Sequence, residues 1–450
     1  MLNSVKVGLL GFGTVGQGIA TILSRNGDEI TRRTGQSVTV IEAAVRDTAK
    51  ASAAASAAGL STAITDDTNR IVNNPDIDIV CEVMGGEQPA LDLCLTAMAN
   101  GKHVVTANKA LVAVHGNTLF EAANKHGVMF GFEPAVAGGI PIIKAVREGL
   151  AGNNIQSLAG IINGTGNFIL TAMTDQGRDF ADVLDEAQAL GYAEADPSFD
   201  VDGIDAAHKL TILASIAFGM PLKFDELLIE GIRDIQQEDV VYANTLGYAV
   251  KHLGIARRRT TDQGEAVELR VHPTLIPQRQ LLANVHGVMN AVLVEGDAVG
   301  QTLYYGPGAG SEPTGSAAVA DITDIVRAMG ADASHQVPPL AFQADALVDL
   351  PVLAAEDIES GYYLRITAED KPGVMADIAG IFGRHNISLE AIVQKEPDPD
   401  NAADNSTATL LPIVLLSHRV REGVMRKAIT EVQALASVPN PVILLRVETL

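Results

Sequence analysis

The sequence predicts a multidomain α/β protein, and three observations carry that prediction. The chain of 450 residues is too long to fold around one hydrophobic core and is long enough for two or three domains. Over residues 5–133, short β-branched runs alternate with helical segments, which is typical of a doubly wound parallel sheet. From residue 361 the order strand, helix, strand, strand, helix, strand predicts a ferredoxin-like sandwich.

Composition excludes several classes of protein. Hydrophobic residues make up 47% and charged residues 19%, which is a globular composition, and no apolar run is long enough to span a membrane. The net charge of −23 disfavours a nucleic-acid partner, since the longest basic run is Arg257–Arg259. Residues 1–10 resemble no signal peptide, and Cys81 and Cys94 give no disulfide framework. We expect a cytoplasmic protein.

The first unit, residues 1–133, contains a glycine motif that indicates a Rossmann dinucleotide-binding domain. Gly11, Gly13 and Gly16 directly follow the strand VKVGLL and open a helix. Backbone N–H groups at such a helix start can bind a pyrophosphate, and the intervening Phe12, Thr14 and Val15 would border it. The alternative is a tight structural turn. The further strands are expected at VTVIEAAV, IDIVCEV, HVVTA and VMFGFE.

Arg46 ends the second of these strands, near the expected ribose 2′ position. An acidic residue there favours NAD, whereas an arginine can accept the phosphate of NADP. Asp47 follows immediately, and Arg46 also fits a solvated charge at a strand end. The sequence therefore favours NADP over NAD without deciding between them.

The second unit, residues 134–335, has a longer, mixed pattern that predicts a separate domain supplying the substrate site. A helix is expected to end at Gly219 before Pro221, with polar turns at 163–167 and 257–265. Prolines and acidic residues over 336–360 indicate a linker to the third unit, residues 361–450.

The acidic stretch 191–209 is where we expect catalytic residues. A helix that begins near Asp202 would place Asp205 and Lys209 one turn apart on one face, beside a buried stripe of Leu210, Leu213, Ala214 and Ala217. Such a pair could face an active site. Spacing alone favours an ordinary surface salt bridge.

This stretch resembles the homoserine dehydrogenase family over residues 187–209. The matching positions are Ala187, Gly191, Tyr192, Ala193, Asp196, Pro197, Asp200, Val201, Gly203, Asp205 and Lys209. The resemblance extends from Val5 to about Gly330 through TANK, FEPAVAGGIPII, NGTGNFIL and GPGAG. It implies an α+β catalytic and dimerisation domain, and interconversion of L-aspartate 4-semialdehyde and L-homoserine with NAD(P)H, a step toward threonine, methionine and isoleucine.

The same resemblance implies roles for individual residues. Lys209 would donate a proton to the carbonyl oxygen, and Glu194, Asp200 and Asp205 would bind the substrate. Lys109, the last residue of TANK, would lie close to nicotinamide and substrate. Charge supports this, since carboxylates suit the substrate ammonium and a lysine can protonate an alkoxide. Lys109 remains an alternative donor, or a plain lysine at a strand end.

Two further sets of residues follow from the resemblance. Glu133, Val136, Gly138 and Ile140 would hold a monovalent cation, sodium or potassium, mostly through backbone carbonyls. The alternative is a structural connection leaving the sheet. Gly191 and Gly310 would line the cofactor.

The third unit resembles the ACT domain, a small amino-acid-binding module, over ITAEDKPGVMADIAGIFGRHNISLEAI. The resemblance implies a regulatory site at Asp370, Gly373, Asn386 and Ile387, with threonine as the expected effector, and a homodimer or homotetramer. A purely structural dimerisation module is the alternative.

Two rival functions have weaker support. An enzyme that makes the semialdehyde from an acyl phosphate needs a nucleophilic cysteine, whereas Cys81 lies in a buried strand pattern and Cys94 in a helix. A non-catalytic sensor would bind dinucleotide and amino acid without turnover, and it would have no need of a proton donor such as Lys209.

Overall fold

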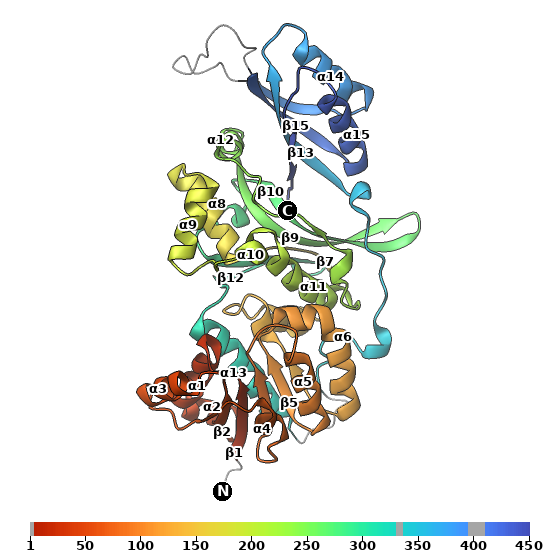
Figure 1. Ribbon diagram of the computed structural model, residues 1–450. Helices are drawn as coiled ribbons and strands as arrows, with labels where there is room; N and C mark the ends of the chain where they lie inside the picture. Colours follow the sequence, from red (N-terminus) through yellow and green to blue (C-terminus); the bar gives the residue numbers. More distant parts are fainter. Residues whose placement is uncertain (1–3, 330–335, 395–409) are drawn as a thin grey trace.

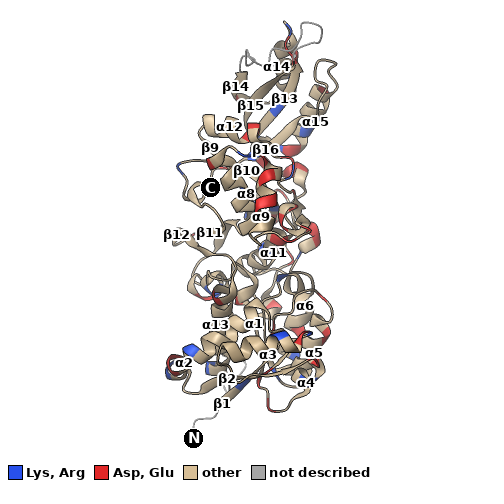
Figure 2. Cartoon of the chain, turned by 60° about the vertical axis from the view of Figure 1, so that its left-hand side comes forward, with Lys and Arg blue, Asp and Glu red and all other residues tan. Residues whose placement is uncertain are grey.

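The computed structural model describes residues 4–329, 336–394 and 410–450. Figure 1 shows an elongated molecule of three units, with the N-terminal unit at one end and the C-terminal unit at the other. The chain end returns to the central unit, beside β10. Acidic residues are distributed along the length of the chain in Figure 2, in keeping with the net charge of −23. Within the described ranges, no helix could cross a membrane.

The N-terminal unit is a parallel six-stranded sheet in the order β3-β2-β1-β4-β5-β6. Its strands are β1 (Ser4–Leu10), β2 (Ser37–Ala44), β3 (Ala63–Thr65), β4 (Ile79–Glu82), β5 (His103–Thr106) and β6 (Phe130–Gly131). Its helices are α1 (Thr14–Arg25), α2 (Gly27–Thr34), α3 (Thr48–Ala57), α4 (Thr68–Asn73), α5 (Ala90–Ala99) and α6 (Lys109–His126). The predicted doubly wound sheet is confirmed. The short strand β3 was not anticipated.

Helix α13 (Ser311–Ala328) returns from the central unit to pack against α1. Its residues Ala318, Ile322 and Ile325 share a hydrophobic core with the N-terminal sheet. The Ser311 hydroxyl donates to the carbonyl of Thr14, 2.7 Å away. Residues 311–328, which the sequence groups with the second unit, therefore complete one face of the N-terminal sheet.

The central unit is built on five long strands and the helices that cover them. The strands are β7 (Ile155–Ile161), β9 (Tyr248–Thr261), β10 (Gly264–Pro277), β11 (Met289–Gly296) and β12 (Gly300–Pro307), with the two-residue β8 (Leu228–Ile229) beside β10. The helices are α7 (Ile142–Lys144), α8 (Gly164–Gln176), α9 (Phe180–Ala189), α10 (Ser198–Val201), α11 (Ile204–Phe218) and α12 (Gln237–Thr245).

Of the two polar turns expected in this unit, the one at 163–167 is wrong, and the one at 257–265 is confirmed only at residues 262–263, between β9 and β10. Residues 164–167 form the first turn of α8, because the Asn163 side chain caps the helix by accepting from the N–H of Gly166. Residues 257–265 belong to the hairpin of β9 and β10, in which Arg257 pairs with Glu268 and Arg259 with Ala266. Charged side chains are tolerated there because they form cross-strand ion pairs.

Helix α11 is buried on every side. The expected stripe at Leu210, Leu213, Ala214 and Ala217 is buried, but so is every other residue from Asp205 to Phe218. The reason is that α6 packs on one side of the helix and β9 and β10 on the other. The helix begins at Ile204 and ends before Gly219, which adopts a left-handed conformation as its C-terminal cap.

The C-terminal unit confirms the predicted βαββαβ order. Its elements are β13 (Glu359–Glu369), α14 (Val374–Arg384), β14 (Leu389–Gln394), β15 (Leu410–Arg421), α15 (Glu422–Gln433) and β16 (Ile443–Val447). Its sheet is continuous with the central one, because β16 pairs with β10 at Thr274↔Arg446 and Leu275↔Val447. The preceding segment also touches β10, where Val267 donates its N–H to the carbonyl of Pro351.

Contact between α1 and α13 depends on a glycine in each helix, Gly18 and Gly315. A Cβ at Gly18 would overlap the carbonyl of Ser311, which is backbone and cannot rotate away. We predict that Gly18→Ala lowers the free energy of unfolding by about 1–3 kcal/mol through overpacking. Gly27→Ala, at the first position of α2, is the control, since a Cβ there meets nothing within 4 Å. Urea unfolding measures both, and equal stability of the two variants would contradict the prediction.

Candidate active site

One buried carboxylate joins two lysines at the junction of the N-terminal and central units. Asp205 lies in the first turn of α11, Lys209 one turn further, and Lys109 at the start of α6, just after β5. Asp205 Oδ1 lies 2.7 Å from Lys109 Nζ, and Oδ2 lies 2.8 Å from Lys209 Nζ. The Asp205 side chain is only 3% exposed. The reading of Asp205 and Lys209 as a surface salt bridge is therefore wrong.

The three charged side chains shift one another's pKa values in different directions. Burial alone would raise the pKa of Asp205, but Lys209 and Lys109 hold it well below its usual range. Burial lowers the pKa of Lys209, and the charge of Asp205 only partly opposes this. Burial also acts on Lys109, yet Asp205, Asp200 and Glu194 raise its pKa above the ordinary value. Lys209 is thus the lysine that gives up its proton more easily.

Asn163 orients both carboxylates of the cluster, a role that sequence reasoning missed. Its Nδ2 donates to Asp200 Oδ1 and to Asp205 Oδ2, both at 2.8 Å. Because its Oδ1 caps α8, the amide cannot turn over without losing that bond. Asn163 opens the NGTGNFIL stretch, and an asparagine before two glycines and a helix was the available signal.

The open side of the cluster faces the loop before α10. Glu194 is exposed on this loop, and its charge acts on Lys109, whose side chain is 34% exposed. The ring of Phe199 lies 5.3 Å from Lys109 Nζ, at cation–π distance. His208 packs between Phe199 and Phe224, and burial lowers its pKa to about 4. His208 is therefore uncharged near pH 7.

The glycine motif lies where the strand order changes direction, between β1 and β4. Gly11 has φ +107°, and a Cβ there would come within 2.8 Å of the Val83 carbonyl. A Cβ at Gly13, the N-cap of α1, would meet nothing within 4 Å. The backbone is thus open to a pyrophosphate on that side. Of the flanking residues, Phe12 is buried and Thr14 exposed.

Arg46 and Asp47 follow β2 at the same edge of the sheet. The carboxylate of Asp47 accepts from the N–H of Lys50 and caps α3. Arg46 is exposed and forms no ion pair with any residue in the described ranges. Gly310, whose φ is +136°, caps α13 near the glycine motif, while exposed Gly191 follows α9.

The segment after β6 contains Glu133, Val136, Gly138 and Ile140, the residues expected to hold a cation. Both carboxylate oxygens of Glu133 accept backbone N–H bonds, from Ile143 at 3.0 Å and Lys144 at 2.8 Å. Burial and the neighbouring charge of Asp321 raise the pKa of Glu133 to about 8, so a nearby cation would relieve this repulsion. The described residues contain no cluster of three His, Cys, Asp or Glu side chains that could hold a metal ion. What favours a cation at this place is the buried carboxylate of Glu133 beside Asp321.

The two cysteines are unsuited to nucleophilic catalysis. Cys81 lies in β4 and Cys94 in α5, and both are fully buried. Burial, with nearby carboxylates, raises the pKa of both thiols. Neither Cys81 nor Cys94 is therefore suited to be the catalytic nucleophile that the rival enzyme class needs.

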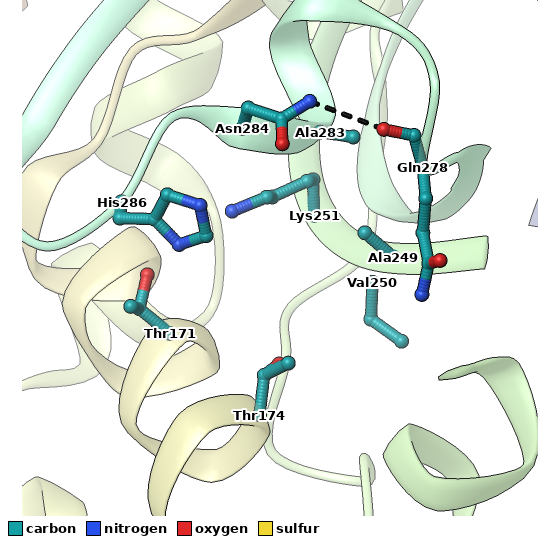
Figure 3. A pocket seen from close by; sticks show the side chains of 9 residues that line it. All are labelled: Thr171, Thr174, Ala249, Val250, Lys251, Gln278, Ala283, Asn284 and His286. Carbon is teal, nitrogen blue, oxygen red and sulfur yellow. Dashed lines mark hydrogen bonds between the residues drawn. The ribbon is translucent and has the colours of Figure 1, made fainter. Parts of the chain in front are cut away.

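A cavity of about 220 Å³ opens elsewhere in the central unit. Its lining is Thr171, Thr174, Ala249, Val250, Lys251, Gln278, Ala283, Asn284 and His286. Figure 3 shows the Lys251 side chain pointing toward His286, with the two threonines on α8 below them. Lys251 Nζ donates to the Val285 carbonyl at 2.6 Å, and burial lowers its pKa to about 8. None of these residues belongs to the lysine–carboxylate cluster.

The residues expected to bind an effector lie at opposite ends of α14. Asp370 and Gly373 precede the helix, whereas Asn386 and Ile387 follow it. The 11-residue helix is about 16 Å long. A single chain therefore does not bring the two pairs together.

Comparison with known proteins agrees with this geometry. Family models match as "Homoserine dehydrogenase, NAD binding domain" over residues 11–133, "Homoserine dehydrogenase" over 141–323 and "ACT domain" over 362–436. Homoserine dehydrogenases of Pseudomonas aeruginosa and Neisseria gonorrhoeae are 56% and 49% identical, each over 100% of both chains.

Solved structures give the same result. A homoserine dehydrogenase from Thiobacillus denitrificans is 55% identical, with a TM-score of 0.92 over 99% of each chain. A hyperthermophilic archaeal homoserine dehydrogenase in complex with NADPH is 28% identical, with a TM-score of 0.61 over 72% of this chain and 98% of that one. With its dinucleotide-binding sheet and its lysine–carboxylate cluster, the chain belongs to the homoserine dehydrogenase family of NAD(P)-dependent oxidoreductases.

Proposed function

We propose that the enzyme reversibly reduces L-aspartate 4-semialdehyde to L-homoserine for the biosynthesis of threonine, methionine and isoleucine, with Lys209 as the proton donor. The observation that carries this is the buried Asp205 shared by Lys209 and Lys109, beside the nucleotide-binding edge of the sheet. The nicotinamide supplies the hydride when bound. The protein residues hold the substrate and deliver the proton.

Lys209 suits the donor role better than Lys109. Its lowered pKa eases proton release to the developing alkoxide, whereas the raised pKa of Lys109 keeps that side chain cationic. Lys209 also donates to the Ile162 carbonyl at 2.8 Å, which fixes its direction. Lys109 would orient substrate and nicotinamide. Glu194, Asp200 and Asp205 would supply carboxylates for the substrate ammonium.

Replacing each lysine in turn separates the two roles. We expect Lys209→Ala to lower kcat about 10²–10⁴-fold, because general acid catalysis is lost. Lys109→Ala should act mainly on KM. The measurement is homoserine oxidation followed as NADPH or NADH formation, with circular dichroism as the folding control. Full turnover in Lys209→Ala, or its loss only in Lys109→Ala, would contradict the assignment.

The pH dependence should respond to Asp205. Reduction needs protonated Lys209, so its rate falls as pH rises through the pKa of that lysine. Asp205 raises this pKa against the effect of burial, so Asp205→Asn lowers it further. The decline of kcat for reduction should therefore move to lower pH, and the rise of kcat for oxidation should move with it. Profiles at saturating substrate measure this, and unmoved limbs would contradict the prediction.

We propose NADP as the preferred cofactor. Arg46 is exposed and without an ion-pair partner in the described ranges, and the carboxylate of Asp47 is engaged as a helix cap. Arg46→Ala should raise KM for NADPH by about tenfold, the order of one charge-assisted hydrogen bond, and change KM for NADH little. Equal effects on both cofactors would contradict this preference.

The cation and the effector complete the proposal. Sodium or potassium would be held by Glu133 and the carbonyls of Val136, Gly138 and Ile140, where it would stiffen the connection out of β6. Exchange of both ions for tetramethylammonium tests whether activity needs them.

Threonine would bind between two ACT units, since one copy does not unite Asp370 and Gly373 with Asn386 and Ile387. The enzyme would accordingly be a dimer or tetramer. Inhibition of the wild type by threonine tests the regulatory role.

A further inference from the structure

We propose that Glu230 is a positioning residue through which the C-terminal unit sets the place of the substrate-binding loop, a name used here for α10 and the turn that follows it, residues 198–203. The inference rests on the proposed function, in which Asp200 of that loop and Asp205, just after it, bind the substrate. Its physical basis is the segment 230–233. The C-terminal unit contacts this segment on one side, and the segment contacts the loop on the other. Glu230 directly follows β8, and its N–H donates to the Val271 carbonyl of β10 at 2.8 Å.

The first contact is a buried arginine of the C-terminal unit. Arg446 of β16, whose side chain is 1% exposed, donates to Glu230 from Nη1 at 2.6 Å and from Nη2 at 2.9 Å. The same guanidinium donates from Nε at 2.8 Å to Glu422, the first residue of α15. Arg426 adds a longer contact to Glu230, at 3.4 Å. Such a bidentate pair fixes direction as well as charge.

The second contact is between residues 231–233 and the loop. Ile232 donates its N–H to the Val201 carbonyl at 2.8 Å, and Gly231 lies so close that a Cβ would overlap that same carbonyl. Arg233 forms an ion pair with Asp202 and donates to the Ser198 hydroxyl at 2.9 Å. Residues 198–202 are therefore positioned by the segment at three points.

The loop leads directly into the lysine–carboxylate cluster. Val201 follows Asp200, which is bonded to Asn163, and Gly203 caps the helix whose second residue is Asp205. Any displacement of Val201 therefore moves the carboxylates on both sides of it. Misplacement on the scale of 1 Å is enough to impair substrate alignment.

A second route runs through the backbone of Glu230. Its carbonyl accepts from His252 Nε2 at 3.0 Å, and the His252 ring lies against Gly203, where a Cβ would be 3.2 Å from Cε1. Burial lowers the pKa of His252 to about 4, so the ring stays neutral and keeps its Nε2 proton for Glu230. Side chain and backbone of Glu230 thus act on the same turn.

The chain offers a matched control for Glu230. Glu238 is also a partly exposed carboxylate of the central unit that pairs with a C-terminal arginine, Arg365, at 3.4 Å. The side chains of Glu230 and Glu238 are 32% and 41% exposed. Glu238 lies on α12, outside the contacts that hold residues 198–202. Glu230→Gln and Glu238→Gln therefore remove the same charge from the same junction, and only the first acts on the loop.

The experiment measures steady-state homoserine oxidation and its inhibition by threonine in both full-length variants, with melting temperatures as the folding control. We expect Glu230→Gln to raise KM for homoserine about fivefold or more, with kcat within about twofold, and to weaken threonine inhibition by a similar factor. Glu238→Gln should match the wild type. Unchanged KM in Glu230→Gln, or an equal rise in both variants, would overturn the inference.

The outcome for threonine is separable from the outcome for KM. If threonine does not inhibit the wild type but Glu230→Gln still raises KM, the regulatory proposal fails and the positioning role stands. If threonine inhibits the wild type and both variants equally while KM is unchanged, regulation stands and Glu230 is not its link.

Discussion

The rest of the site depends on Asp205, a carboxylate held away from water between two ammonium groups. Burying an isolated charge costs several kcal/mol, so the arrangement exists only because every partner is supplied from a fixed element. Lys209 comes from the same helix, Lys109 from the start of α6 and Asn163 from the cap of α8. The fold brings these three helix starts to one point. Loss of any partner would leave a neighbour buried with its charge or hydrogen bond unmet.

Because these partners come from different units, the N-terminal and central units must pack against each other and not only be joined by a connecting segment. Helix α6 belongs to the N-terminal sheet but packs on α11, and α13 crosses back to lie on α1. Each crossing element is anchored by close backbone approach or by buried side chains, not by a flexible connection. Lys109 and Lys209, which lie 100 residues apart in the sequence, can then both bind the carboxylate of Asp205 with little freedom of movement.

Local pattern was enough to predict the elements, but not their surroundings. The alternation of strands and helices, the glycine motif and the βαββαβ order were readable because each depends on residues near in sequence. The four-residue spacing put Asp205 and Lys209 on one face, yet their burial depends on α6, β9 and β10, which local periodicity does not reveal. The same reason hid the pairing of β16 with β10 and the extension of β9 and β10 into residues 257–265, since cross-strand partners stabilise both. Asn163 had a visible capping signal that was read only as a polar turn.

The union of β10 with β16 makes the C-terminal unit a poor candidate for excision. Arg270 of β10 is wholly buried and donates to Glu448 at 2.6 Å, while Glu448 also accepts from Ser360 at 3.0 Å. A protein cut before β13 would bare the backbone edge at Thr274 and Leu275 and leave Arg270 without Glu448, with its longer contact to Glu268 at 3.3 Å still in place. Exposed strand edges recruit other chains and promote aggregation. Excision of the C-terminal unit would therefore deprive the central unit of both a strand partner for β10 and an ion-pair partner for Arg270.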